Sequence, residues 1–309
     1  MIDLTIVIPA FNESARLEAG YERLAPTLEV IGESGVEVIV VDDGSSDNTL
    51  TRAHEVYGHL EHALFLQQPT NRGKGAALRL GMGLARGTNV ITADADMAID
   101  PGQFPLFTTS LRDTEFVPGT RAVAGRIAYG SPLRTLGGSL FHRFAHHYTH
   151  TGQRDTQCGC KGFQLAAARL LASFAMVDRF AFDVELFYLA DQLDLSVKPL
   201  LVTWKDVPGS SVRPLRDAGI MLRDIRAIRT TRYENIVVEL PLDVRVEDAA
   251  TAAREARLQG LVLARGDENA VLVVGRNGGP GGLGVASVLK GQMRTASLAE
   301  LRGRRYEAI

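Results

Sequence analysis

The feature that most constrains the fold of this chain is a repeated alternation of short apolar runs with longer segments of helical pattern. Four runs, at residues 4–9, 36–41, 63–68 and 89–96, have the length of buried strands, and all but 63–68 contain several β-branched residues. The segments between them can hold crossover helices, which parallel strands require. The sequence therefore predicts an α/β fold with a mostly parallel sheet flanked by helices.

Further elements are expected beyond the fourth run. The pattern predicts a helix at 101–111, a strand at 115–121, helices at 164–176 and 182–193, and a strand at 196–204. In the first crossover, Asn12 or Ser14 is a candidate cap for a helix that runs to about residue 32.

The arginine-rich segment 213–233 is expected to form a basic amphipathic helix. We assign it to a main domain at residues 1–235, because a single core stops growing at roughly 250 to 300 residues. Residues 236–309 differ in character and predict a small β/α module, including a charged helix. This module is a candidate for dimerisation or regulation, so a homo-oligomer is possible.

Charge and targeting signals restrict the setting. The net charge of −2 and the pI near 6.4 argue against nucleic acid as a partner. The N-terminus lacks a basic region typical of a signal peptide, and Arg169 interrupts the longest apolar run. Cys158 and Cys160 are too close for an unstrained bridge and are expected to be buried thiols. We therefore expect a cytoplasmic protein with at most peripheral contact with a membrane.

Two carboxylates close the fourth apolar run. Asp94 and Asp96 flank Ala95 at the expected carboxyl end of a strand. Carboxylates there can hold a hard divalent cation, Mg²⁺ or Mn²⁺, together with a diphosphate. A lone D-x-D motif is also compatible with a solvated strand end, so the neighbouring motifs decide its interpretation.

Polar motifs follow the earlier strands as well. The segment PAFNE (9–13) follows the first run, DDGSSD (42–47) follows the second, and NRGKG (71–75) precedes a helix. Ligands of parallel sheets bind outside the carboxyl ends of the strands, and a helix N-terminus favours an anion. The set predicts a nucleotide site, although NRGKG matches no Walker motif.

The motifs IVIPAFNE, VVDDGSSDNT, NRGKGAAL and DAD, in this order, closely resemble those of the family 2 glycosyltransferases over about residues 3–233. DTQCGCKGF (155–163), FDVEL (182–186) and the arginine-rich segment are similar to the dolichyl-phosphate glucosyltransferase branch of that family. The resemblance implies a Rossmann-like GT-A fold and an inverting transfer of glucose from UDP-glucose to a polyprenyl phosphate. Cys160, where that branch usually has an aromatic residue, and the absence of a transmembrane helix are departures.

The resemblance also implies roles for individual residues. Pro9, Ala10 and Glu13 would line the nucleoside site, and Asp43 would accept a hydrogen bond from the base.

On the phosphate side, Lys74 would face the ribose or the diphosphate, Asp94 the ribose-phosphate side, and Asp96 the metal. Negative charge grows on the departing UDP as the sugar gains oxocarbenium character. A metal at Asp96, with Lys74 or Arg121 nearby, would stabilise that leaving group.

The acceptor side depends on what the acceptor is. A phosphate is already ionised near pH 7, whereas a hydroxyl needs a general base. Asp155 is the candidate carboxylate, with Asp183 and Glu185 as alternatives. For a phosphate acceptor Asp155 could instead orient the acceptor or the metal, and Arg121 or Arg126 would have to offset the repulsion between anions.

The arginine-rich helix, through Arg223, Arg226 and Arg229, fits an interfacial helix on anionic lipid, although a solvated face is the usual fate of such charges. Arg126 begins a basic, aromatic stretch at 126–150 that could form the entrance for a lipid acceptor. Four histidines in that stretch fit a solvated or lipid-facing helix better than a metal site. They are His142, His146, His147 and His150.

Three further functions remain open at this point. The enzyme could use GDP-mannose to mannosylate a polyprenyl phosphate, because no residue rule here separates uracil from guanine. It could transfer sugar to a soluble acceptor. Alternatively, the chain could bind a nucleotide sugar without catalysis.

Overall fold

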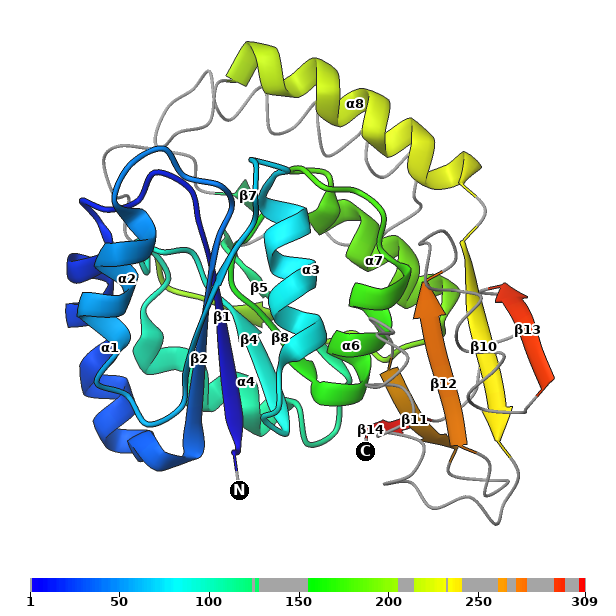
Figure 1. Ribbon diagram of the computed structural model, residues 1–309, viewed down its shortest axis with the longest axis horizontal. Helices are drawn as coiled ribbons and strands as arrows, with labels where there is room; N and C mark the ends of the chain where they lie inside the picture. Colours follow the sequence, from blue (N-terminus) through cyan, green and yellow to red (C-terminus); the bar gives the residue numbers. More distant parts are fainter. Residues whose placement is uncertain are drawn as a thin grey trace.

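A seven-stranded sheet with the order β3-β2-β1-β4-β8-β5-β9 forms the centre of the protein (Figure 1). Its strands are β1 (Leu4–Ala10), β2 (Val36–Asp42), β3 (Ala63–Gln67), β4 (Asn89–Thr92), β5 (Phe116–Thr120), β8 (Lys161–Gln164) and β9 (Leu200–Leu201). The computed structural model describes residues 2–123, 126–127, 155–204, 214–231, 233–240, 261–265, 271–276, 292–297 and 306–308.

The middle of this sheet is parallel, as the sequence predicts. β1 pairs in parallel with β2 on one side and with β4 on the other, starting from Leu4 opposite Val36 and Asn89. All seven residues of β2 are buried. A strand covered on both faces needs a largely apolar run, and this is why the runs at 4–9 and 36–41 were recognisable in the sequence.

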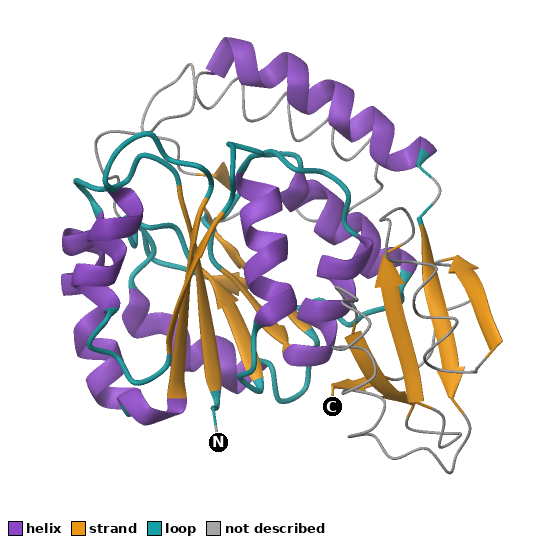
Figure 2. Ribbon diagram, viewed as in Figure 1, coloured by secondary structure: helices purple, strands orange, loops and turns teal. Residues whose placement is uncertain are grey.

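Helices cover both faces of the sheet (Figure 2). One core contains side chains from α1 (Leu17–Ile31), α2 (Thr49–Tyr57) and α4 (Phe104–Ser110). The opposite core contains side chains from α3 (Lys74–Leu84), α6 (Leu165–Phe174) and α7 (Phe182–Gln192). Short 3₁₀ turns precede β2 and α4, at Glu33–Gly35 and Pro101–Gln103. These two layers on a mixed sheet confirm the predicted fold class.

Strand β8 was not predicted. It lies antiparallel between β4 and β5, so that Phe163 is opposite both Val90 and Phe116. The strand has only four residues and begins with Lys161, and a charged residue hides the apolar pattern of so short an element.

Two predicted strands are shorter in the structure. β4 ends at Thr92, before Asp94 and Asp96, because Met97 N donates to Asp94 O at 2.9 Å and closes a tight turn. The segment 196–204 runs beside β5, but its regular pairing is limited to Leu200–Leu201.

The predicted N-cap of α1 was wrong. Arg16 occupies that position and makes no side-chain cap hydrogen bond. Asn12 and Ser14 instead bond to residues 45–47 of the loop after β2, so their side chains join two loops.

A second sheet is formed by strands that follow α8 in the sequence, and it lies beside α6 (Figure 1). It is antiparallel, with the order β13-β10-β12-β11-β14. Its strands are β10 (Glu234–Leu240), β11 (Leu261–Arg265), β12 (Val271–Arg276), β13 (Gln292–Ser297) and β14 (Tyr306–Ala308). The charged helix expected within this module lies outside the described residues, and the division of the chain at residue 235 stays a prediction.

Helix α8 (Pro214–Thr230) lies on the side of the molecule where β1 and β2 end (Figure 1). Ile225 and Ile228 are buried in the core that contains α3, α6 and α7, whereas Arg223, Arg226 and Arg229 are exposed. The described side chains of α8 are therefore amphipathic, as predicted. Among the described residues, no helix is both long and apolar enough to cross a bilayer.

Arg126 and Ile127 are the described residues of the expected acceptor entrance. The stretch 128–150, including the four histidines, lies outside the described residues, and Arg126 is described only as backbone of the short ribbon β6 (Ala122–Val123) and β7 (Arg126–Ile127).

Candidate active site

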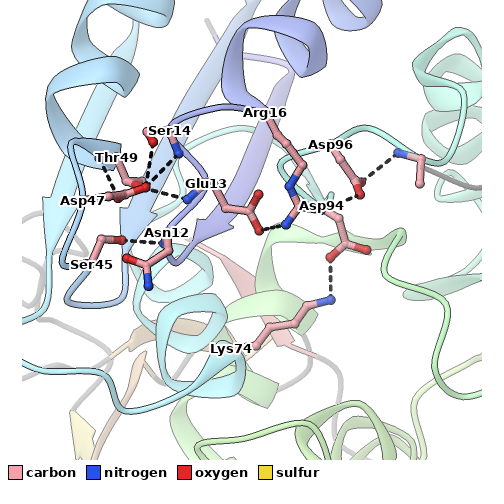
Figure 3. Close-up of polar contacts among 11 residues, drawn as sticks. Asn12, Glu13, Ser14, Arg16, Ser45, Asp47, Thr49, Lys74, Asp94 and Asp96 are labelled. Atoms are coloured by element: carbon pink, nitrogen blue, oxygen red, sulfur yellow. Dashed lines mark hydrogen bonds and ion pairs between the residues drawn. The ribbon is translucent and has the colours of Figure 1, made fainter. Parts of the chain in front are cut away.

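The polar motifs predicted to meet at one edge of the sheet do meet there. The loops after β1, β2 and β4 share this edge because the three strands are parallel. Figure 3 shows Glu13, Lys74, Asp94 and Asp96 around one opening, although they come from three different parts of the sequence.

Lys74 and Asp94 form an ion pair at the centre of this opening, with Nζ and Oδ1 2.6 Å apart (Figure 3). Burial alone would lower the pKa of Lys74, but the carboxylates of Asp94 and Asp183 outweigh it and raise that pKa. Desolvation would raise the pKa of Asp94, but Lys74 outweighs it and lowers that pKa. Both groups are therefore charged near neutral pH.

Gly159 makes room for the Asp94 carboxylate. A Cβ on Gly159 would lie 2.0 Å from Asp94 Oδ2, which no real side chain tolerates. Gly159 O also accepts a hydrogen bond from Thr92 Oγ1 at 3.1 Å, which ties the residue to the end of β4. The loop before β8 thus forms one wall of the site.

Asp96 and Glu13 share Arg16. Arg16 Nη2 lies 2.5 Å from Glu13 Oε1, and Arg16 Nη1 lies 3.6 Å from Asp96 Oδ2. Asp96 Oδ1 also accepts a hydrogen bond from Ala98 N at 3.1 Å. Burial raises the pKa of Asp96, and the neighbouring carboxylate of Asp94 raises it further. Burial also raises the pKa of Glu13 in spite of Arg16. Glu13 Oε2 is buried without a hydrogen-bond partner among the described residues.

Asp43 organises the loop that leads to Lys74. Its Oδ1 accepts from Gln68 Nε2 at 3.0 Å and from Arg72 N at 2.8 Å, and its Oδ2 accepts from Asn71 Nδ2 at 3.0 Å and Gly73 N at 2.7 Å. Four donors fill the acceptor capacity of a carboxylate. Its predicted bond to a nucleoside base stays a prediction, and it requires one of these partners to yield.

The loops after β1 and β2 are held together by short polar side chains. Asn12 N donates to Ser45 Oγ at 2.9 Å, and Asn12 Oδ1 accepts from Ser46 N at 2.9 Å. Asp47 accepts from Ser14 Oγ at 2.7 Å (Figure 3). Pro9 and Ala10 end β1 directly beneath these loops, so the predicted nucleoside-lining positions lie at a rigid rim.

Asp155, in the loop before β8, forms a second ion pair with Arg121, which follows β5. Arg121 donates from Nε and Nη2 to the two Asp155 oxygens, both at 2.9 Å, and from its backbone N at 2.8 Å. Burial would raise the pKa of Asp155, but Arg121 outweighs it and lowers that pKa. Asp155 is therefore a buried carboxylate ion and a weak base.

A third pair links two motifs noted in the sequence. Lys161 Nζ donates to Asp183 Oδ1 at 2.6 Å and to Cys158 O. Burial raises the pKa of Cys158 to about 11, so this thiol stays protonated, and both cysteines are buried and free, as predicted.

Glu185, the other alternative carboxylate, is bonded to the segment between α6 and α7 and to Tyr233. It accepts from Met176 N and Val177 N, both at 2.9 Å, and from Tyr233 Oη at 3.0 Å. As an acceptor-side group it is therefore a poor candidate, because both of its oxygens already accept hydrogen bonds from the protein.

A divalent metal fits the residues at this edge. Mg²⁺ is commonly held by one or two carboxylates together with substrate phosphates, and Asp94 and Asp96 supply two, with Glu13 Oε2 unpartnered beside them. Within the described part of the chain no group of three or more His, Cys, Asp or Glu side chains forms a metal cluster. The donor set thus suits a metal that arrives with a diphosphate.

Sequence reasoning missed Arg16, Lys161 and Gly159. Lys161 and Gly159 lie within DTQCGCKGF, which the resemblance had singled out, but their partners Asp183 and Asp94 are 22 and 65 residues away. Arg16 lies three residues after Glu13, the last residue of PAFNE, and a basic residue so close to this motif was the available signal.

Comparison with known proteins identifies the family of this chain. The family Glycosyl transferase family 2 matches residues 5–170. The chain is 36% identical over 239 residues to a dolichyl-phosphate beta-glucosyltransferase of Drosophila melanogaster, covering 72% of this chain and 73% of that protein. It is 34% identical over 242 residues to the Homo sapiens protein of that name, covering 73% and 74%.

Solved structures share the fold. Glucosyl-3-phosphoglycerate synthase from Mycobacterium tuberculosis, in complex with Mn²⁺, UDP and glucosyl-3-phosphoglycerate, superposes with a TM-score of 0.52 at 21% identity, covering 74% of this chain and 78% of that chain. Its complex with Mg²⁺ and UDP also has a TM-score of 0.52 at 21% identity and covers 78% and 85%. With the strand order and the family match, these similarities show that the chain belongs to glycosyl transferase family 2 and is a glycosyltransferase with the GT-A fold.

Proposed function

We propose that this protein transfers glucose, with inversion, from UDP-glucose to a polyprenyl phosphate such as dolichyl phosphate at a membrane surface. The observation that carries the acceptor assignment is the state of Asp155. A hydroxyl acceptor needs a general base, and the best placed carboxylate is an ion whose pKa Arg121 lowers. A phosphate acceptor is already ionised and needs no such base.

The donor side follows from Lys74, Asp94 and Asp96. A diphosphate at this edge would meet the Lys74 ammonium and the N-terminus of α3, both of which favour an anion. A bound Mg²⁺ or Mn²⁺, held by Asp96 and Asp94, would supply Lewis-acid stabilisation of the departing diphosphate. Arg16, 3.6 Å from Asp96, adds a second cation on this side.

The acceptor phosphate would approach from the side of Arg121. Its negative charge would be repelled by Asp155, and the Arg121 guanidinium between them offsets that repulsion. In this arrangement Asp155 holds Arg121 in place and orients it toward the incoming phosphate.

Contact with the membrane is assigned to α8. Arg223, Arg226 and Arg229 are exposed on a helix whose other face packs on the protein, and each arginine near an anionic leaflet contributes about 1 kcal/mol. The buried free thiols fit a reducing compartment, so we assign the cytoplasmic face.

The test is a transfer assay with purified protein, Mn²⁺ and a short polyprenyl phosphate in detergent. Radiolabelled UDP-glucose and GDP-mannose are offered separately, and label is counted in the organic phase. The proposal predicts transfer from UDP-glucose that EDTA abolishes. Transfer from GDP-mannose alone would correct the donor, and label that remains in the aqueous phase with a soluble acceptor would correct the acceptor.

A further inference from the structure

The segment Met176–Arg179, between α6 and α7, lies directly against the N-terminus of α3. Ala76 N donates to Asp178 O at 3.0 Å. A Cβ on Gly73 would lie 2.4 Å from Asp178 O, and a Cβ on Gly75 would lie 2.6 Å from Val177 O. The two glycines of NRGKG that flank Lys74 therefore lack side chains because this segment occupies the space.

The Asp178 carboxylate joins both sides of Lys74. Its Oδ1 accepts from Arg79 Nη2 at 2.5 Å, and its Oδ2 accepts from Arg72 Nη2 at 3.2 Å. Arg72 precedes Lys74 in the loop, and Arg79 follows it on α3 with only 8% of its side chain exposed. One carboxylate thus connects the loop and the helix between which Lys74 lies.

On its other side the segment is hydrogen-bonded to Glu185, and Val177 packs against the core. Glu185 accepts from Met176 N and Val177 N, as described above. Beyond them a cavity of about 270 Å³ separates the segment from α8, with Asp178, Glu185, Ile228 and Tyr233 in its lining. Because no packed side chains fill this space, the bonds of Asp178 and Glu185 contribute to where the segment lies.

We propose that Asp178 is a positioning residue, which sets the place of Lys74 relative to Asp94 through Arg72, Arg79 and the backbone at Ala76. This inference rests on the proposed function, in which Lys74 binds the donor diphosphate. The segment supports the α3 N-terminus, the α3 N-terminus carries Lys74, and Lys74 meets Asp94 at 2.6 Å. Loss of a residue that supports a ligand-binding side chain typically costs 10-fold or more in affinity, about the effect expected here.

The sign of the effect separates this proposal from simple electrostatics. Asp178→Asn removes a negative charge near an anionic ligand, so electrostatics alone predicts tighter binding of UDP. Positioning predicts the opposite, about 10-fold weaker binding of Mn²⁺-UDP in calorimetry. Glu18→Gln is the matched control, because Glu18 makes the same kind of pair with Arg52, at 2.5 Å, but is itself 63% exposed and has no bond to the residues around Lys74 among the described contacts.

A double-mutant cycle with Lys74→Met completes the test. If Asp178 acts through Lys74, D178N weakens Mn²⁺-UDP binding in the wild-type background and has no further effect in the K74M background. Unchanged or tighter binding by D178N, or equal weakening in both backgrounds, overturns the inference while the role of Lys74 stands. Unchanged binding by K74M overturns the proposed donor site, and the inference with it.

Folding of the variants is checked by thermal unfolding, since D178N leaves the buried Arg79 charge without its carboxylate. Asp178→Glu keeps that charge but lengthens the side chain by one methylene, so its affinity should lie between wild type and D178N. If D178N does not fold, D178E carries the same cycle with K74M, and wild-type affinity in D178E then counts against the inference.

Discussion

Gly159 offers the sharpest test of the site geometry, because the three atoms nearest to a methyl group there all belong to the Asp94 carboxylate. A Cβ would lie 2.0 Å from Oδ2, 2.7 Å from Cγ and 2.9 Å from Oδ1. A carbon–oxygen contact needs about 3.3 Å. In Gly159→Ala the carboxylate must therefore move by roughly 1 Å, and it must leave the position in which it meets Lys74.

The expected cost is large in activity. A misplacement of 1 Å at a reacting centre lowers the rate by about 100-fold. We expect G159A to lower kcat/KM for the sugar donor by about that factor and to weaken Mn²⁺-UDP binding measured by calorimetry. The thermal unfolding temperature should change little, because Asp94 lies at the site opening and its side chain can rotate toward solvent.

Gly83→Ala is the matched control for this substitution. Gly83 lies on α3 and is exposed, and a Cβ there would meet nothing within 4 Å. An alanine in a helix is favoured over glycine by about 1 kcal/mol, so G83A should retain full activity and be slightly more stable. A G159A protein with wild-type kcat/KM would refute the assignment of Asp94 to the donor site.

Three further predictions follow from the charges. Asp96→Asn should abolish metal-dependent transfer. Its unfolding temperature at pH 7 should be unchanged or higher, because burial raises the pKa of Asp96 and the charged carboxylate destabilises the folded state. As the pH is lowered, the wild-type protein should lose Mn²⁺ affinity at a higher pH than a site with an ordinary aspartate would, because Asp96 takes up its proton earlier. Asp155→Asn should lower the free energy of unfolding, measured with urea at pH 7, by about 3 kcal/mol. The difference from wild type should narrow as the pH falls below about 4, because the pKa of Asp155 is lowered in the folded state and its protonation there removes the stabilising charge. Equal free energies of unfolding at pH 7 would contradict the buried pair. Changing Arg223, Arg226 and Arg229 together to Gln should weaken sedimentation with anionic liposomes, most clearly at low salt, and unchanged sedimentation would count against the interfacial helix.

Several elements of this protein follow from local sequence alone. The runs that became β1 and β2 are largely apolar because both faces of these strands are covered, so each run identified its strand without knowledge of its neighbours. The position of Asp94 and Asp96 at the ligand edge followed in the same way, from the parallel order that alternating strands and helices impose. The amphipathic pattern of α8 is likewise a property of one segment.

The tertiary structure alone decided how the site is charged and shaped. The sequence indicated Asp155 as the candidate carboxylate on the acceptor side, but only its pairing with Arg121, 34 residues away, made it a weak base. Strand β8, four residues long, brings Gly159 against Asp94 and Lys161 against Asp183. Periodicity reports which face of an element is buried, whereas these contacts depend on which elements the sheet order makes neighbours, and that order is a property of the whole chain.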